Sequence, residues 1–494
     1  MTIAPTVSMR TLLNIGLLAG FTIVYTGLIG MIQVFSERSI IYGILTLGQL
    51  LIFLPPLVAG FIAARRSQHL GAGRAFVNAG MVGLIAAVLP ILLVLFISNV
   101  DIRFMFVNAS PALIDQLTFG RGVPMGSAFL ALAGLVSGSI GGILVLLPLP
   151  IRRSIIFGAS WVIGVGLLSE LMIQILRNLF GNNAGRIIFQ SGALKPLPAI
   201  IIFVVAALAS LLWSMQGNNV KSRYAGMSES SKRATQRAGV GLLGVFLLML
   251  PWIVGTFLSE VLSNVGLYVL MALGLNIAVG LAGLLDLGYV TNFAVGAYVM
   301  GVLTSTGPLG KGEFSFWLII PVSVISAMIT GFLLALPVLR MRGDYLAIAT
   351  LGFGEIIRLL ALSDWLAPYI GGAQGILFIP KPQIGGFIVD TPQEFYYLIL
   401  AACFIMLFIS VRLNNSRTGR QWMAMREDED AAGAMGIDTT LAKLLAFTLS
   451  AASGGLAGAI FASKLGAIFP HSFSLLISIN VLSIIIVGGM GSIP

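Results

Sequence analysis

The stretch that decides the fold is Ser416–Ile437, SRTGRQWMAMREDEDAAGAMGI, which carries seven charged residues in a chain that is only 9% charged. It separates two apolar segments that are each long enough to cross a bilayer, since a spanning helix needs about 20 residues. Basic residues near the ends of spanning segments resist translocation. Arg417, Arg420 and Arg426 therefore predict that this charged stretch faces the cytoplasm.

The composition of the whole chain indicates that its main solvent is lipid. Apolar residues make up 58% of the 494 residues and the mean hydropathy is +1.02, far above the values of soluble domains. We therefore predict an all-α fold, a polytopic transmembrane helical bundle with about 14 spans. The predicted spans are 11–35, 40–63, 75–98, 127–150, 154–176, 197–215, 239–259, 263–284, 288–305, 315–338, 345–366, 395–411, 441–462 and 474–491.

The distribution of basic residues sets the predicted orientation. With the N-terminus in the cytoplasm, the inner connections hold 18 of the 28 Lys and Arg residues and the outer connections hold nine. This bias has the direction expected for a membrane protein. The net charge of +10 is spread over the connections rather than gathered on one face, which favours membrane lipids as partners over nucleic acid.

A polar, basic segment divides the chain. Residues 216–237 are rich in Gly, Asn, Ser, Lys and Arg and separate six predicted spans from eight. We predict a six-span membrane region over residues 1–215, a basic cytoplasmic linker over 216–237 and a second membrane domain over 238–494. No motif in the first region indicates a role, and its recurring glycines, such as Gly134 and Gly138, predict close helix packing.

Within the charged stretch, the residues predict a short helix. Glu429 and Asp430 suit a helix N-terminus, where carboxylates interact favourably with the macrodipole, and Gly436 suits the end. Ala431–Ala434 carry almost no side chain, so another protein surface can approach the backbone closely. Two interpretations stay open: a docking helix, or an ordinary solvated loop, because Glu427–Asp430 are scattered around the helix axis rather than gathered on one face.

The same stretch resembles a known family. Asp430-Ala431-Ala432, followed by three residues and Gly436, resembles the Glu-Ala-Ala-x-x-x-Gly cytoplasmic loop of ATP-binding-cassette (ABC) importer permeases, with Asp in place of the usual Glu. The surrounding Gly419-Arg420 and Arg426–Glu429 are similar to the branched-chain amino-acid permease family in particular. In that family the loop is the coupling helix that seats on the ATPase subunit. The resemblance implies an ATPase-coupling role for Gly419, Arg420, Arg426, Glu427, Asp428, Glu429, Asp430, Ala431, Ala432 and Gly436.

Glycines and polar residues interrupt the apolar runs early in the second membrane domain. Gly274–Asn276 and Gly280–Gly288 predict broken or re-entrant backbone, which survives at membrane depth only beside protein or a water-filled cavity. They mark a candidate permeation path, and a simple loop between two spans fits the spacing equally well. They also resemble the family's opening signature, Gly-Leu-Asn and then a Gly-rich turn, with Asp286 in place of a small Ser or Asn. The candidate pathway residues here are Asn276, Gly283 and Asp286.

Leu339–Arg358 is the longest family-like stretch. Arg340 and Arg342 predict an inner anchor, and the span that follows carries Glu355 and Arg358 three residues apart, on one helix face. A structural ion pair and a role in the substrate pathway both fit this spacing, since pairing offsets much of the cost of burying two charges. If the pair belongs to the pathway, Glu355 is its leading candidate and Arg358 accompanies it.

The resemblance extends over roughly residues 261–494 and includes the glycine-rich run Gly488–Ser492. The family normally continues from there into further hydrophobic segments. Two alternatives follow: a chain that is shorter than its relatives, or a permease-like domain that is incomplete at Pro494.

The resemblance implies the transmembrane permease of an ATP-driven importer for branched-chain or other apolar amino acids, or a small amide such as urea, in the plasma membrane of a bacterium or archaeon. The implied partners are ABC ATPase subunits, a second permease subunit and a soluble substrate-binding protein. Gly307–Gly312 lacks the Gly-x4-Gly-Lys-Ser/Thr spacing of a phosphate cradle. ATP and Mg are therefore assigned to partner subunits, with no cofactor or metal expected on this chain.

Two other classes of function stay open. An ion-coupled secondary transporter would place its proton or sodium site at Glu170, Asp286 or Glu355. A structural membrane subunit of a larger complex would account for a first half without a motif. An enzyme is not expected, because one cysteine and two histidines leave little from which to assemble a catalytic triad or a metal cluster.

Overall fold

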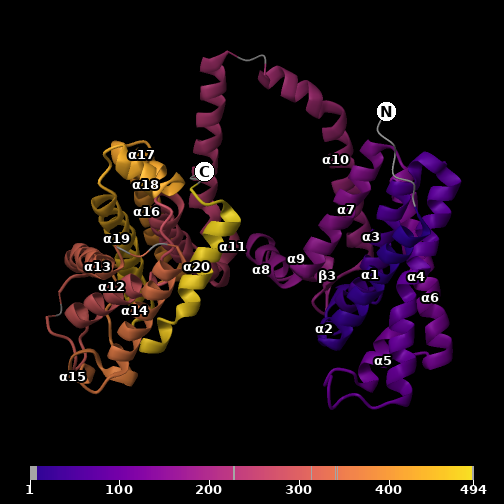
Figure 1. Cartoon of the computed structure of the whole chain (residues 1–494), viewed down its shortest axis with the longest axis horizontal. Coiled ribbons are helices and arrows are strands. Elements are labelled where there is room, and N and C mark those ends of the chain that lie inside the picture. The colour runs from indigo at the N-terminus through magenta and orange to yellow at the C-terminus, as the bar shows by residue number, and fades with distance from the viewer. Residues whose placement is uncertain (1–7, 226–227, 313, 340, 342, 492–494) are drawn as a thin grey trace. The chain divides into compact units, whose positions relative to one another are not determined.

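The computed structural model describes residues 8–225, 228–312, 314–339, 341 and 343–491, with the side chains of 215–225, 229, 233 and 344 left out. The chain forms two compact units, Met1–Leu242 and Leu243–Pro494 (Figure 1). Both consist almost entirely of helices, which confirms the predicted all-α bundle. Arg340, Arg342 and Pro494 lie outside the described residues.

The first unit is a helical bundle that also contains four short strands. Its elements are α1 (Met9–Leu28), α2 (Met31–Ser36), β1 (Ser39–Ile41), β2 (Leu45–Thr46), α3 (Leu47–Ser67), η1 (Gln68–Leu70), α4 (Ala72–Asn99), α5 (Pro111–Leu117), α6 (Val123–Leu146), α7 (Leu149–Leu167), α8 (Ser169–Phe180), α9 (Ala184–Ile188), β3 (Phe189–Gln190), β4 (Ala193–Leu194) and α10 (Pro196–Ala225). The strands form one sheet in the order β2-β1-β4-β3, in which β1 and β4 pair in parallel.

The boundary between the units falls inside α11 (Glu229–Asn276). The elements of the second unit that follow are η2 (Ile277–Leu281), α12 (Val290–Thr304), α13 (Phe316–Val338), α14 (Asp344–Leu362), α15 (Ala367–Ile370), η3 (Gly372–Gln374), β5 (Gln383–Ile384), β6 (Phe387–Ile388), α16 (Pro392–Asn414), α17 (Arg417–Glu427), α18 (Glu429–Ala434), α19 (Thr439–Leu465), η4 (Pro470–Ser472) and α20 (Leu475–Gly488).

The number of spans differs from the predicted fourteen. Among the described residues, 11 helices are long and apolar enough to cross a membrane, or 12 if the bent pair α7 and α8 counts as one span. Four predicted segments account for the difference of three spans. Segments 239–259 and 263–284 share the kinked helix α11 without a loop between them, 154–176 bends, and 288–305 is short.

The two spans predicted at 239–259 and 263–284 belong to α11, which kinks at Gly255 (φ 77°, ψ −176°) without an intervening loop. Two polar residues beside the predicted boundary between these spans are held by one lysine. Lys464 Nζ lies 2.8 Å from Glu260 Oε1 and 2.6 Å from Asn264 Oδ1, and only 5% of the lysine side chain is exposed. Lys464 of α19 thus pairs with polar side chains of α11, which stays helical through the predicted boundary.

The other two differences come from a bend and from a short helix. Predicted span 154–176 bends by 80° between α7 and α8. Predicted span 288–305 corresponds to α12, whose 15 residues extend only about 22 Å, less than the thickness of about 30 Å of the hydrocarbon core. Before α12, the π-helical turn η2 and the non-helical residues 282–289 confirm the predicted break in the backbone.

Small residues set the helix packing in the first unit. A Cβ added at Gly138 would lie 2.5 Å from the carbonyl oxygen of Ala79, and one added at Gly134 would lie 2.5 Å from that of Gly83. Backbones that approach this closely leave no room for side chains, as is common where membrane helices pack. The close packing predicted around Gly134 and Gly138 is confirmed.

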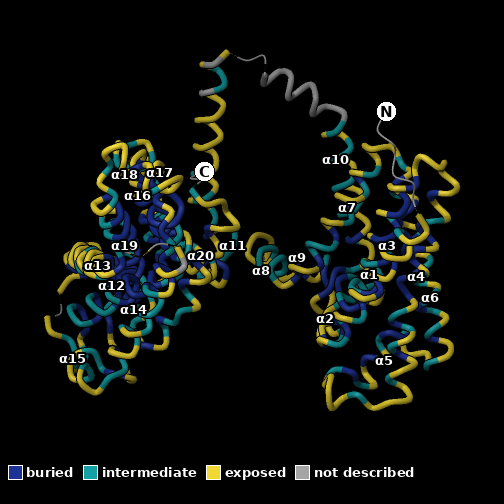
Figure 2. The backbone as a smooth tube through the Cα atoms, in the orientation of Figure 1, coloured by how far each residue is buried: buried dark blue, intermediate teal, exposed yellow. Residues whose placement is uncertain are grey.

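The second unit is organised around α19, which packs extensively against α12 and α13. A Cβ added at Gly458 of α19 would lie 2.0 Å from the carbonyl oxygen of Phe293 in α12. Figure 2 shows α12 and α19 largely buried. Helices α16 and α20 expose large apolar side chains, such as Phe408 and Val487. In Figure 1, α17 and α18 lie at one end of this unit and α15 at the other.

Candidate functional site

Helix α17 is fixed at its start by a cap and along its length by one buried tryptophan. Ser416 Oγ accepts a hydrogen bond from the Gly419 N–H at 3.0 Å. A Cβ at Gly419 would lie 2.1 Å from the carbonyl oxygen of Leu413, so this tight entry requires glycine. Trp422 is fully buried and its Nε1–H donates to the Ala442 carbonyl at 2.8 Å, which ties α17 to α19.

The short helix predicted in the charged stretch is present as α18. Asp428 caps it, since its Oδ1 accepts the Ala431 N–H at 2.9 Å, and Gly436 (φ 87°) follows its end. Ala432 is buried against the unit. The outward residues of the helix and its end carry small side chains or none, apart from one acid and one methionine. They are Asp430, Ala431, Gly433, Ala434 and Met435.

Glu429 points into the unit rather than toward solvent. Its Oε1 lies 2.6 Å from Lys443 Nζ in α19, and only 4% of that lysine side chain is exposed. Lys443 also donates to the Leu339 carbonyl at the end of α13, at 3.3 Å. Glu429 therefore anchors α18 to two helices of the bundle, a role that its place in a run of four acids did not predict.

Arg426 joins the charged stretch to the break in the helical backbone. Its Nη1 donates to the Gly280 carbonyl at 2.6 Å. Gly283 (φ 72°) lies against its stem, because an added Cβ would be 2.9 Å from Arg426 Cγ. Asn276 Oδ1 accepts the Gly491 N–H at 3.1 Å, beside Gly280. We call these five residues the arginine junction: Asn276, Gly280, Gly283, Arg426 and Gly491.

The structure thus brings together three residues that were predicted for two different roles. Asn276 and Gly283 were candidates for the substrate pathway, and Arg426 was a candidate for coupling. Gly491 is an addition that the sequence did not suggest, since nothing local links it to a turn more than 200 residues earlier.

Asp286 lies in a second polar group, further along the irregular segment 282–289. It is 4% exposed and its Oδ1 accepts the Gly288 N–H at 2.9 Å, while Leu287 N–H donates to Thr350 Oγ1 at 3.0 Å. With Asn292 it lines a cavity of about 10 Å³, about the space that one water molecule needs. Among the described residues, the Asn292 side-chain oxygen has no hydrogen-bond partner.

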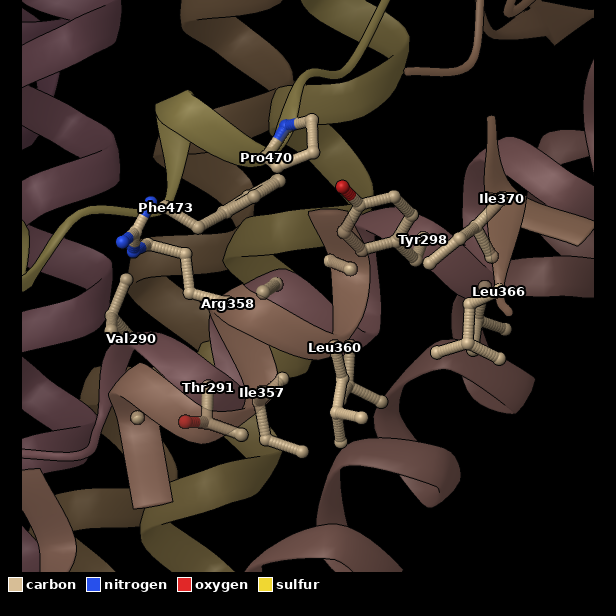
Figure 3. Close-up of a pocket in the computed structure, with 15 residues that line it drawn as sticks. Val290, Thr291, Tyr298, Ile357, Arg358, Leu360, Leu366, Ile370, Pro470 and Phe473 are labelled. Carbon is tan, nitrogen blue, oxygen red and sulfur yellow. The ribbon is translucent and has the colours of Figure 1, made fainter. Parts of the chain in front are cut away.

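A larger cavity of about 200 Å³ lies between α12, α14, α15 and η4 (Figure 3). Its walls are mainly apolar: Val290, Ala294, Val295, Val299, Ile357, Leu360, Ala361, Leu366, Ile370, Pro470 and Phe473. Three polar side chains join them. The hydroxyl oxygens of Thr291 and Tyr298 are buried and have no partner among the described residues, and Arg358 enters from α14.

Glu355 and Arg358 form the predicted ion pair on α14. Arg358 Nη2 lies 2.5 Å from Glu355 Oε1, and the two side chains are 24% and 44% exposed for Arg358 and Glu355 respectively. Arg358 lines the large cavity, whereas Glu355 is outside its lining. The cavity residues come from three regions far apart in the sequence, namely α12, the neighbouring helices α14 and α15, and η4, so no local motif could have identified them.

The chain matches one family model over residues 257–494, described as "Branched-chain amino acid transport system / permease component". It is 40% identical over 265 residues to the high-affinity branched-chain amino acid transport system permease protein LivM of Escherichia coli, covering 49% of this chain and 61% of that protein. It is 24% identical over 256 residues to the permease protein LivH of Salmonella typhimurium, covering 48% of this chain and 80% of that protein.

A relative from Methanocaldococcus jannaschii, the probable branched-chain amino acid transport permease protein LivM, is 25% identical over 253 residues, covering 44% of this chain and 70% of that protein. The chain spans about three fifths of the length of the Escherichia coli relative. No solved structure matches the chain. The match agrees with the family that the charged stretch and the glycine-rich segments resemble. The chain is a multi-pass membrane protein, and its residues 257–494 are similar to permeases of branched-chain amino acid transport systems.

Proposed function

We propose that the chain is the membrane-spanning permease subunit of an ATP-driven importer in a bacterial or archaeal plasma membrane. The transported molecule is a branched-chain or other apolar amino acid, or a small amide such as urea. Separate ABC ATPase subunits bind ATP and Mg and dock at α17 and α18 on the cytoplasmic side. A second permease subunit completes the path, and a soluble binding protein delivers the substrate.

The observation that carries this proposal is the arginine junction. Arg426 belongs to α17, next to the exposed face of α18, and it holds the Gly280 carbonyl in the π-helical turn η2. Residues 282–289 connect that turn to α12, whose first residues line the large cavity. A displacement of α17 by a partner therefore has a short covalent and hydrogen-bonded route to the cavity wall.

The surface of α18 suits close docking. Ala431, Gly433 and Ala434 are exposed, and no atom lies within 4 Å of a Cβ built on Gly433. A partner can thus approach the helix backbone directly. The Glu429–Lys443 pair and the Trp422–Ala442 hydrogen bond hold the two short helices to α19, so that a push on them is transmitted to the bundle.

The large cavity suits a small apolar substrate. Its aliphatic and aromatic walls favour a hydrocarbon side chain over a charged or sugar-like one. The Arg358 guanidinium at its edge is the natural partner for a carboxylate, and the free hydroxyls of Thr291 and Tyr298 can bond a polar head group. In this arrangement Glu355 holds Arg358 in place, because its carboxylate oxygens accept hydrogen bonds from the guanidinium.

The test compares two glycine substitutions, Gly433→Trp on α18 and Gly386→Trp in the turn between β5 and β6, because neither glycine has an atom within 4 Å of an added Cβ. Each variant is purified from cells with its associated proteins, and branched-chain amino acid uptake is measured. We expect Gly433→Trp to lose a copurifying ATPase and ATP-driven uptake, while Gly386→Trp keeps both. Uptake that survives ATP depletion but collapses with the ion gradient would contradict the proposal.

A further inference from the structure

The first unit has an amphipathic helix at the end of a membrane-spanning segment. Helix α8 leaves α7 at 80°. Its polar residues recur at helical spacing and form one stripe: Glu170, Gln174, Arg177 and Asn178. The other positions are mostly apolar, and Phe180 and the nearby Ile187 of α9 are 73% and 70% exposed. A short helix of this kind, turned across the direction of the span, is typical of the interface between lipid tails and head groups.

A basic cavity lies beside this helix. It has a volume of about 460 Å³ and is formed by α8, α9, β3 and the turn before β4. Its lining consists of Ile173, Arg177, Asn182, Gly185, Arg186, Phe189, Gln190, Ser191 and Gly192. Two of these nine residues are arginines, three more carry amide or hydroxyl groups, and none is acidic.

The two arginines have unused binding capacity. Among the residues that the structure describes, neither the Arg177 nor the Arg186 guanidinium is within ion-pair distance of a carboxylate, and neither has a side-chain hydrogen bond. Lys195 adds a third cation nearby, since its Nζ donates to the Arg186 carbonyl at 2.7 Å. The site therefore carries concentrated positive charge that the protein itself leaves uncompensated.

The cavity is held open by its own backbone. Ser169 Oγ, at the start of α8, donates to the Gly192 carbonyl at 2.5 Å. Ser191 and Gly192 both have positive φ values, 49° and 76°, which form the tight turn between β3 and β4. Because β4 pairs with β1, this turn is also fixed to the loop between α2 and α3. The guanidinium groups thus border a formed cavity rather than a free loop.

We propose that this cavity binds the phosphate group of a membrane phospholipid through Arg177 and Arg186. Guanidinium groups bind phosphate oxygens with paired, charge-assisted hydrogen bonds, and Asn182 and Gln190 can complete the coordination. The exposed Phe180 and Ile187 then contact the acyl chains beside the head group. Free inorganic phosphate shares the same anionic chemistry, but it has no apolar part that could contact Phe180 and Ile187.

This site gives the first unit a role in lipid binding that does not depend on the transport reaction. The bend at α8 places the two arginines at the end of the span, where head groups lie. Residues of α8 and of the small sheet line the cavity, and α7 contacts both α8 and β4. A bound lipid would therefore hold α7, α8 and the sheet together.

The test uses the full chain in detergent and native mass spectrometry of lipid binding. The probes are dioleoylphosphatidylglycerol, dioleoylglycerol without a phosphate, and inorganic phosphate. The variant is R177Q/R186Q. Its matched control is R65Q/R66Q, which removes the same charge from two exposed arginines at the end of α3. Thermal unfolding without added lipid checks that both variants fold.

We expect the phospholipid to bind the unaltered chain and the control with equal affinity. Its affinity for R177Q/R186Q should be at least about tenfold lower, because charged hydrogen bonds are lost. R177K/R186K, which keeps the charge but not the paired donors, should be intermediate. Equal lipid binding by R177Q/R186Q and R65Q/R66Q would overturn the proposal. Equal affinity for inorganic phosphate would reject a lipid in favour of a soluble anion, and equal binding of dioleoylglycerol would show that the phosphate is not recognised.

Discussion

The Nη1 atom of Arg426 lies 2.6 Å from the carbonyl oxygen of Gly280, 146 residues earlier in the chain. The first residue belongs to the charged stretch and the second to the π-helical turn η2. Hydrogen bonds to charged donors are stronger than those between neutral groups, so this contact is well suited to transmit a displacement. It links the proposed docking site to the broken helix without passing through a long series of side chains.

Replacing Arg426 with glutamine should uncouple the two regions. We expect substrate uptake to fall about tenfold, since the charge-assisted bond to Gly280 is lost. ATP hydrolysis by the assembled complex should persist, because α18 is unaltered. The measurement is uptake and ATPase activity of the same reconstituted sample. Arg417→Gln removes an equal charge from the exposed start of α17 and serves as the control. Equal losses in both variants would argue against a specific link.

Gly283→Ala should disturb the same junction from the other side. The left-handed backbone of Gly283 costs about 1 kcal/mol for alanine, and the new Cβ would lie 2.9 Å from Arg426 Cγ. We expect a lower free energy of unfolding and reduced uptake. Gly352→Ala in α14 is the control, because that position is helical and has no atom within 4 Å of an added Cβ. A Gly283→Ala protein as stable and active as this control would contradict the close packing.

The buried pair between Glu429 and Lys443 should respond as a unit. Glu429→Gln leaves the lysine charge without its partner and should lower the free energy of unfolding by about 3 kcal/mol. The double variant E429Q/K443M should regain much of that loss, because the uncompensated charge is removed as well. Unfolding titrations of the purified protein measure both. Glu427→Gln, at an exposed position two residues away, should change stability by less than about 0.5 kcal/mol. Additive losses in the double variant would exclude the coupling.

Filling the large cavity should change substrate selection. Ala294 is 5% exposed and lines the cavity, so Ala294→Leu reduces its volume from within. We expect the KM for leucine to rise about tenfold and the KM for alanine to change little, since a methylene group in a tight pocket is worth about 1–3 kcal/mol. Ala401→Leu on the exposed side of α16 controls for the added bulk. A uniform change for all amino acids would place the substrate elsewhere.

The orientation of the second unit can be tested through its single cysteine. Cys403 is replaced by alanine, and a new cysteine is introduced at Met435, which is 84% exposed after α18, or at Gly386 in the β5–β6 turn. A membrane-impermeant maleimide should label the cysteine at 435 only from the cytoplasmic side and the cysteine at 386 only from outside. Labelling of position 435 from outside intact cells would reject the proposed orientation and, with it, docking of a cytoplasmic ATPase.

Local patterns predicted much of the fold. Apolar runs identified most of the spans, and an acidic start with a glycine stop identified α18. The glycines at 280–288 predicted the break before α12. These features depend on neighbouring residues, so a single sequence contains the information for them.

Predictions failed where distant residues decide the outcome. The sequence analysis ended one span at residue 259 and began the next at 263, but α11 stays helical through this boundary, where Glu260 and Asn264 contact Lys464, at least 200 residues away. Glu429 was predicted at the start of a short helix, but its contact with Lys443 of α19 had no local signal in the sequence. The large cavity has no motif at all, because its walls come from single apolar residues on α12, α14, α15 and η4.

The small side chains on the exposed face of α18 have a consequence for how ATP-driven importers of this kind would diversify. A helix that presents methyl groups and a glycine would offer the proposed ATPase subunit a surface shape to fit, with few side-chain hydrogen bonds to match. Recognition by shape tolerates many substitutions in the groove of the ATPase that would receive α18, provided that the depth of the groove is preserved. We expect one ATPase to serve permeases that transport quite different substrates. Substrate specificity would then evolve in the membrane helices independently of the ATPase subunit.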